Sequence, residues 1–255
     1  MTPSGEQQTF KLQLLRPRAL ARFRTRLAGA MVSTLLPPLL VSLLLAGCGE
    51  SAPSATTLLQ EAQVHFSAAQ SFHVLYLVEE AQHLTQSNLF YLTRADGDIQ
   101  RPSKLSAIVD ALTPSGALSG AKLIVIGGQG WLANPQTDQY QRDDDVVPFS
   151  RLFDPQTGLG ALLTQIEQPR PTQGYKDIWI TSGSVPADTL SAMLPRLAGH
   201  SDPVAIQVDV SRSDHQLVAL NLTGMLFPGE SGPYSHLFSF SRFGAPVRIQ
   251  PPTNP

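Results

Sequence analysis

The spacing of hydrophobic residues changes several times along the chain, and each change marks a different expected element. Between residues 55 and 70 the apolar positions recur every three or four residues, which predicts a helix with one apolar face, and Ser54 is a suitable N-terminal cap. Beyond residue 71, short runs of β-branched and aromatic residues alternate with turn residues, a pattern typical of strands. We expect strands at residues 72–78, 89–93, 104–111, 121–126, 131–133, 175–182, 204–210, 216–225, 236–240 and 247–249.

Two further helices are expected in the second half of the chain. Asp154 precedes Pro155, and this pair combines a capping carboxylate with a proline at the first helical position. The apolar residues that follow, up to Ile166, keep helical spacing, and residues 186–194 predict a second short helix. Residues 94–98, Arg-Ala-Asp-Gly-Asp, predict a turn. Because most neighbouring strands have no helix between them, the order of elements predicts an α+β fold and not a βαβ array.

Several of the expected strands carry apolar residues on both faces, most clearly residues 72–78 and 121–126. An antiparallel sheet with one face open to water normally alternates apolar with polar residues. The pattern therefore indicates either that both faces are covered or that one face lines a cavity for an apolar ligand. From the pattern alone, an ordinary packed core is favoured over a cavity.

The N-terminal residues follow a pattern of their own. Six Lys and Arg precede a stretch from Leu27 to Gly49 that contains no charged residue. This stretch ends in Leu45-Ala46-Gly47-Cys48, which resembles the bacterial lipobox, where small residues fit the signal peptidase and the cysteine thiol accepts diacylglycerol. We therefore predict a lipoprotein signal peptide at residues 1–47 and lipidation of Cys48. A membrane-anchor helix with a chance cysteine is disfavoured, because Pro37-Pro38 would break it and because the chain has no other cysteine.

Removing residues 1–47 changes the charge of what remains. The whole chain has a net charge of −2, whereas residues 48–255 contain 12 Lys and Arg against 19 Asp and Glu, which gives −7. An acidic chain lacks the basic surface that nucleic-acid binding requires, so we expect no nucleic-acid partner. Lipidation would use the only thiol and leave none for a disulfide. We expect residues 48–55 to form an acylated tether and residues 56–255 to form one folded domain.

Candidate motifs for catalysis or metal binding are weak. The six histidines are dispersed, and no two of them have the spacing that places two ligands on one helix face. Asp143-Asp144-Asp145 lacks the spaced ligands of a calcium loop, so a solvated turn is favoured. Gly229-Glu230-Ser231-Gly232 is not a nucleophile elbow, because its second glycine is misplaced. We expect no cofactor, no metal and no enzymatic activity.

Three segments resemble the LppX/LprA/LprF/LprG lipoprotein family of mycobacteria and related bacteria. Residues 152–163 resemble its Asn/Asp-Pro helix start, residues 179–188 its strand-to-helix step, and Asp214-His215-Gln216-Leu217 its hairpin. The resemblance begins at the lipobox and covers nearly all of the chain after it. The sequence departs from the family at Arg212-Ser213, where Thr-Gly is usual, and residues 82–119 match poorly.

The resemblance implies a curved antiparallel half-barrel sheet packed against helices and enclosing an apolar cavity, similar to the LolA and LolB carriers of lipoproteins. It implies that residues 56–255 bind lipid and are anchored through Cys48 to the extracytoplasmic face of the cytoplasmic membrane. The implied ligand is an acylated lipid or glycolipid, carried from that membrane to the outer cell envelope. An envelope transporter is a candidate further partner, and no catalytic residue is carried over.

The resemblance favours the cavity over the packed core. We expect a monomer whose cavity is lined by one alternating set of strand residues and its neighbours, namely Val74, Tyr76, Val78, Leu123 and Val125. The opposite set, Leu75 and Leu77, is the alternative, because a shift of one residue exchanges the two faces. The alternative function is a non-carrier envelope sensor on a LolA-like scaffold that binds a regulatory protein partner. A hydrolase of envelope lipids is a third hypothesis.

Overall fold

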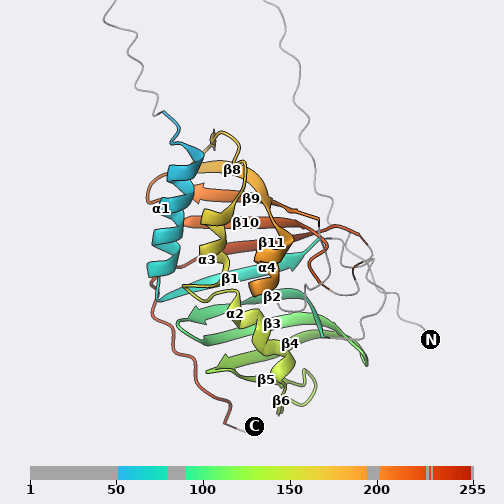
Figure 1. Ribbon diagram of the computed structural model, residues 1–255. Coiled ribbons are helices and arrows are strands. Elements are labelled where there is room, and N and C mark those ends of the chain that lie inside the picture. The colour runs from blue at the N-terminus through green and yellow to red at the C-terminus, as the bar shows by residue number, and fades with distance from the viewer. Residues whose placement is uncertain (1–50, 80–89, 194–201, 228–229, 231, 254–255) are drawn as a thin grey trace, which may run out of the picture. The chain divides into compact units, whose positions relative to one another are not determined.

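Eleven antiparallel strands form one open sheet in the part of the chain that the structure describes (Figure 1). This computed structural model describes residues 51–79, 90–193, 202–227, 230 and 232–253, and residues 50–255 form a single compact unit. The strands are β1 (Ser71–Val78), β2 (Tyr91–Gln100), β3 (Lys104–Thr113), β4 (Gly116–Ile126), β5 (Gln129–Ala133), β6 (Tyr140–Arg142), β7 (Gln173–Tyr175), β8 (Ile178–Val185), β9 (Val204–Ser211), β10 (Leu217–Gly224) and β11 (Tyr234–Ser241). The helices are α1 (Ala55–Ala68), α2 (Val147–Arg151), α3 (Leu159–Leu162) and α4 (Ala187–Met193), with the short 3-10 helices η2 (Asp144–Val146) and η3 (Leu163–Gln165).

The sheet is made of two meanders that meet at its centre. The strand order is β6-β5-β4-β3-β2-β1-β11-β10-β9-β8-β7, and α2 and α3 lie in sequence between the two meanders. The first and last strands pair with each other, with His73 opposite Ser241 and Val78 opposite His236. The expected antiparallel sheet with few helices is confirmed as an open sheet, whereas the cavity stays a prediction. The expected domain boundaries also stay predictions, because residues 1–47 and Cys48 lie outside the described residues.

Burial alternates along the strands and distinguishes the two faces of the sheet. On β1 the even-numbered residues from Phe72 to Val78 are buried, whereas Leu77 on the opposite side is 38% exposed. Figure 1 shows α1 to α4 on one side of the sheet, and Phe66 of α1 packs against Phe72 with ring centroids 5.1 Å apart. The buried set therefore faces the helices. We call this side the covered face and the opposite side the outer face.

Helix α1 begins and is held as its sequence predicts. The Ser54 hydroxyl accepts a hydrogen bond from the Thr57 backbone N–H at 3.1 Å, which is the expected N-terminal cap. Further along α1, the Glu61 carboxylate lies 2.7 Å from Nδ1 of His215, which sits in the hairpin between β9 and β10 with a φ of 51°. The Asp-His-Gln-Leu segment that resembles the family hairpin thus connects that hairpin to the helix.

The turn predicted at residues 94–98 is wrong, because these residues lie inside β2. Gly97 faces the covered side, and a Cβ atom there would lie 2.2 Å from the Ser106 carbonyl oxygen, so only glycine permits this approach of β3. The charged residues of the segment point to the outer face, where Arg94 pairs with Asp96 at 3.1 Å and Asp98 with His73 at 2.9 Å. A composition typical of a turn therefore reflects a close strand contact and charge pairs on the outer face.

The strand predicted at residues 247–249 is also wrong. These residues have no regular secondary structure, although Ile249 is buried and its backbone N–H donates to the Gln100 side-chain oxygen at 3.2 Å. Pro246 and Pro251 flank the segment, and prolines lack the N–H that a sheet ladder needs. The apolar spacing of the segment therefore marks one anchoring side chain and no strand.

The helix predicted after Asp154 is divided into a capped turn and the separate helix α3. Oδ1 of Asp154 accepts hydrogen bonds from the backbone N–H groups of Gln156 and Thr157, both at 2.8 Å, and this is the expected capping role. The chain then turns back at Gly158, where a Cβ atom would lie 2.3 Å from the Leu152 carbonyl oxygen. The Thr-Gly-Leu sequence thus allows a tight turn, after which the leucines of α3 are buried against the core.

Replacing Asp154 by alanine is expected to lower the free energy of unfolding by about 1 kcal/mol at neutral pH. Burial alone would raise the pKa of the Asp154 carboxyl, but the hydrogen bonds from Gln156 and Thr157 outweigh it and hold the pKa below its ordinary value. The stabilisation is therefore complete above the unfolded pKa and disappears as the pH falls through the lower folded pKa. Urea unfolding of both proteins at several pH values measures this. Loss of bound lipid with an unchanged melting temperature would instead make Asp154 a binding residue.

Candidate functional site

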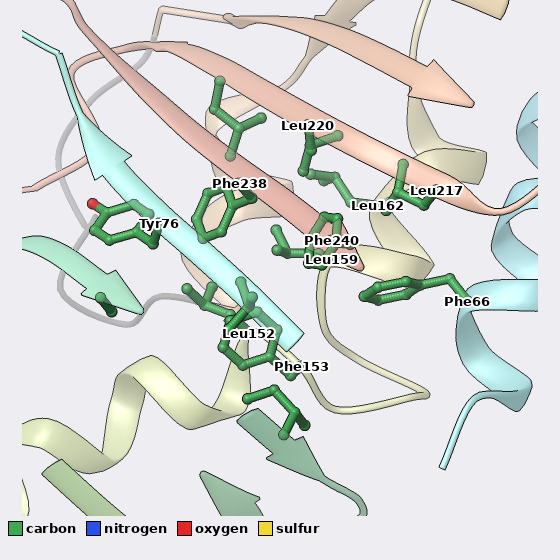
Figure 2. Packing of buried hydrophobic residues seen from close by; sticks show 14 of the residues in the cluster. Phe66, Tyr76, Leu152, Phe153, Leu159, Leu162, Leu217, Leu220, Phe238 and Phe240 are labelled. Carbon is green, nitrogen blue, oxygen red and sulfur yellow. The ribbon is translucent and has the colours of Figure 1, made fainter. Parts of the chain in front are cut away.

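The covered face is one continuous apolar surface beneath the helices (Figure 2). All five side chains that we predicted to line a cavity belong to it, and none of them is more than 3% exposed. Val74, Tyr76 and Val78 lie on β1, whereas Leu123 and Val125 lie on β4, and β2 and β3 lie between these two strands. The alternative set on β1, Leu75 and Leu77, belongs to the outer face. That the five residues bind a ligand stays a prediction.

Small side chains separate the two predicted groups. Val74 and Leu123 are the ends of one cross-strand row, and the two residues between them are Gly97 and Ala107. The next row begins at Tyr76 and continues through residues 95, 109 and 121, two of which are alanine. The covered face is therefore shallow at Ala95, Gly97 and Ala107 and higher at Val74, Tyr76 and Leu123. Sequence reasoning missed these small residues, although their alternate spacing in β2 and β3 is a detectable signal.

An aromatic cluster closes the covered face at the start of β1. Phe66, Phe72 and Phe240 pack with ring centroids 5.0 to 5.9 Å apart. The Arg101 guanidinium lies 4.8 Å from the centre of the Phe66 ring and donates hydrogen bonds to the carbonyls of Phe66, Ser67, Ala69 and Phe153. Burial lowers the pKa of Arg101 to about 10, so the group is still charged at neutral pH. These hydrogen bonds hold Arg101 against the end of α1 and the residue before Asp154.

A buried polar cluster lies at the opposite end of β1. It consists of Tyr76, Tyr91, Glu230 and His236, and the side chains of Glu230 and His236 are both fully buried. The Tyr91 hydroxyl donates to Oε1 of Glu230 at 2.7 Å, and Oε2 accepts from the backbone N–H groups of residues 226 and 227 at 2.5 and 3.1 Å. The Tyr76 hydroxyl lies 3.0 Å from Nδ1 of His236. Polar side chains therefore connect β1 to β11, and β2 to the segment that precedes β11.

The electrostatics of the polar cluster are dominated by the Glu230 carboxylate. Burial, and the nearby negative charge of Glu230, raise the pKa of Tyr76 well above its ordinary value, and burial likewise raises that of Tyr91. Both phenols are therefore protonated at neutral pH. Nε2 of His236 lies 3.2 Å from Oε1 of Glu230 but has no hydrogen-bond partner. Sequence reasoning missed this cluster, although His236 interrupts the apolar residues on the inward side of β11.

Other features of the described residues do not mark a second site. Two surface hollows of about 410 and 360 Å³ have mixed polar and apolar linings, and neither is lined by any of the five predicted cavity residues. Within the described ranges, no group of three or more His, Cys, Asp and Glu side chains is placed to hold a metal ion. Nor does any helix in that part of the chain have the length and apolar character needed to cross a membrane.

The sequence of this chain matches a known family over most of its length. The model of the LppX_LprAFG lipoprotein family matches residues 54–249, which run from the cap of α1 to the segment beyond β11. The chain belongs to this lipoprotein family. No curated protein sequence matches it.

Solved structures support the LppX_LprAFG fold. LprF from Mycobacterium bovis is 18% identical, with a TM-score of 0.58, and the alignment covers 79% of this chain and 99% of LprF. LppX from Mycobacterium tuberculosis is also 18% identical, with a TM-score of 0.53 and coverage of 78% and 100%. A LolA superfamily protein from Nitrosomonas europaea is 10% identical, with a TM-score of 0.29 and coverage of 78% and 96%, and this similarity is too low to carry an argument. At these identities the comparison establishes the fold of the family.

Proposed function

We propose that this protein is a lipid-anchored carrier at the extracytoplasmic face of the cell membrane. Lipid on Cys48 would hold it there, while the covered face binds an acylated lipid or glycolipid and carries it from the cytoplasmic membrane toward the outer envelope. Membership of the lipoprotein family supports this proposal. The observation that carries it is the broad apolar face, with small residues between Val74 and Leu123, beneath a cover of short helices.

The cover of the apolar face is easier to move than the sheet. Helices α2, α3 and α4 contain five, four and seven residues, and helices this short have little stability of their own. Every strand of the sheet, in contrast, is held by an antiparallel ladder. We infer that lipid enters as these helices separate from the covered face. Each buried CH₂ group would contribute about 0.8 kcal/mol, which offsets the lost contacts of the helices.

Lipid analysis of the purified protein tests this function. Residues 49–255 are produced without the signal peptide, and their bound molecules are examined by native mass spectrometry and by organic extraction. A carrier is expected to retain a stoichiometric lipid with two or three acyl chains. A sensor would yield no lipid but a specific protein partner on crosslinking, and a hydrolase would turn over lipid esters. Either of those outcomes would contradict the carrier.

A further inference from the structure

The polar cluster lies where a lipid on the covered face would end. Tyr76 belongs both to the cluster and to the row of β1 residues that face the helices. The rings of Phe149 and Phe238 lie 5.3 and 4.8 Å from the Tyr76 ring, and Phe227 lies 5.4 Å from the ring of His236. The cluster is therefore a small polar patch inside an aromatic wall. An acyl chain beside Tyr76 would bring its polar end into reach of this patch.

Structural needs account for only part of the cluster. Oε2 of Glu230 fixes the β10–β11 loop through two backbone N–H groups, and Oε1 accepts from Tyr91. On the other side, Nε2 of His236 is fully buried, faces Oε1 at 3.2 Å and has no hydrogen-bond partner. A buried polar atom without a partner is costly, and apolar side chains at such positions are often at least as stable. His236 thus presents a ring nitrogen that faces the Glu230 carboxylate but makes no hydrogen bond.

The charge of the cluster limits the ligand group that it can receive. The Glu230 carboxyl accepts three hydrogen bonds, which favour its charged form, both tyrosines are neutral, and the basic group of the cluster is His236. Arg101, 8% exposed, is the other buried charged side chain among the described residues, and its Nε and one terminal nitrogen donate hydrogen bonds at the opposite end of β1. Whichever form His236 takes, the cluster has no net positive charge. A phosphate would therefore enter a cluster with no net positive charge to balance its own, whereas a hydroxyl could bond to Nε2.

We propose that Glu230 and His236 select the headgroup of the bound lipid, and that they favour an uncharged, hydroxyl-bearing headgroup over an anionic one. This inference rests on the proposed carrier function. In the proposed lipid complex, Nε2 of His236 contacts the headgroup hydroxyl and Glu230 repels phosphate. The two tyrosines hold Glu230 and His236 in place.

A transfer assay with two lipids tests the selection. The full-length chain is anchored in donor vesicles that contain diacylglycerol and phosphatidic acid, which have the same fluorescent acyl chains and differ only in the phosphate. Transfer to acceptor vesicles is measured for each lipid, after subtraction of the rate without protein. We expect the wild type to favour diacylglycerol by about tenfold or more, as a repulsion across a few ångströms in a protein interior predicts.

Three variants separate selection from folding. Glu230→Gln keeps the shape of the side chain and should bring the ratio of the two rates close to one by increasing phosphatidic acid transfer. His236→Phe should decrease diacylglycerol transfer without increasing that of phosphatidic acid, and it tests the proposal even if the Glu230 variant fails to fold. Asp209→Asn is the matched control, because Asp209 is a partly buried carboxylate on the outer face, and its ratio should equal that of the wild type.

The outcomes distinguish the two proposals. If the wild-type protein transfers neither lipid, the carrier function itself fails. If it transfers both at equal rates, or if folded Glu230→Gln and His236→Phe proteins keep the wild-type ratio, the carrier stands and the selection by Glu230 and His236 is overturned.

Discussion

Replacing Cys48 by alanine is expected to abolish anchoring of the protein in the membrane. Cys48 is the only thiol in the chain and directly follows Leu-Ala-Gly, so no other side chain can take its place. Two or three acyl chains give stable membrane binding where one chain gives only marginal binding, and the variant would lose all of them. Detergent phase partitioning and labelling with radioactive palmitate measure the loss. The variant is expected in the aqueous phase or as an unprocessed precursor, without label.

A matched variant tests whether the loss of membrane anchoring is caused by removal of the thiol. Ser51→Ala changes a small polar residue three positions further along and leaves the lipobox intact. It should partition and label like the wild type. Unchanged partitioning of the Cys48 variant would mean that another segment holds the protein in the membrane, and the signal-peptide prediction would then be wrong.

Replacing Val125 by tryptophan is expected to eliminate bound lipid. Val125 is completely buried on the covered face, at the β4 end of the row that begins at Phe72. Val125 lies two residues along β4 from Leu123, on the same face, so an indole ring would extend into the space proposed for acyl chains. Because the lipid-free face is packed, the added volume should also lower the free energy of unfolding by about 1–3 kcal/mol. Lipid extraction and urea unfolding measure the two effects.

The neighbouring residue provides the control for Val125. Ile124 belongs to the outer face, so Ile124→Trp adds the same ring on the other side of the same strand. Its bound lipid should be unchanged. If both variants retain lipid, the covered face near β4 is not the binding surface. A large decrease in melting temperature for Val125→Trp, together with no lipid ever recovered from the parent, would contradict the carrier at this position.

Local periodicity was sufficient to predict much of the fold. The alternation on β1 places Val74, Tyr76 and Val78 on one side, and that side is the buried one. Prediction failed where a residue's role depends on a distant strand: Gly97 suggests a turn until β3 is placed against it. The segment around Ile249 failed for a similar reason, since burial of one side chain does not require a ladder.

The polar cluster could not be predicted from spacing along the chain. Tyr91 and Glu230 are 139 residues apart, and Tyr76 and His236 are 160 residues apart. Only the pairing of β1 with β11 brings them together, and that pairing joins the two ends of the folded unit. Residues 229–232 lack the glycine spacing of a nucleophile elbow. That local test gives no information about the position of Glu230 between two tyrosines and a histidine.

The pairing of β1 with β11 has a consequence for the order in which the chain folds. The middle of the sheet cannot be completed until residues 234–241 have been synthesised, because β1 must wait for a partner that comes last among the strands. Contacts between segments so far apart in sequence form slowly, because a long loop must close, at a cost in chain entropy, before these contacts can stabilise the fold. A chain exported during synthesis, N-terminus first, would therefore reach the far side of the membrane before its central ladder existed. For the exported lipoprotein proposed above, this topology would delay completion of the sheet until translocation is almost finished.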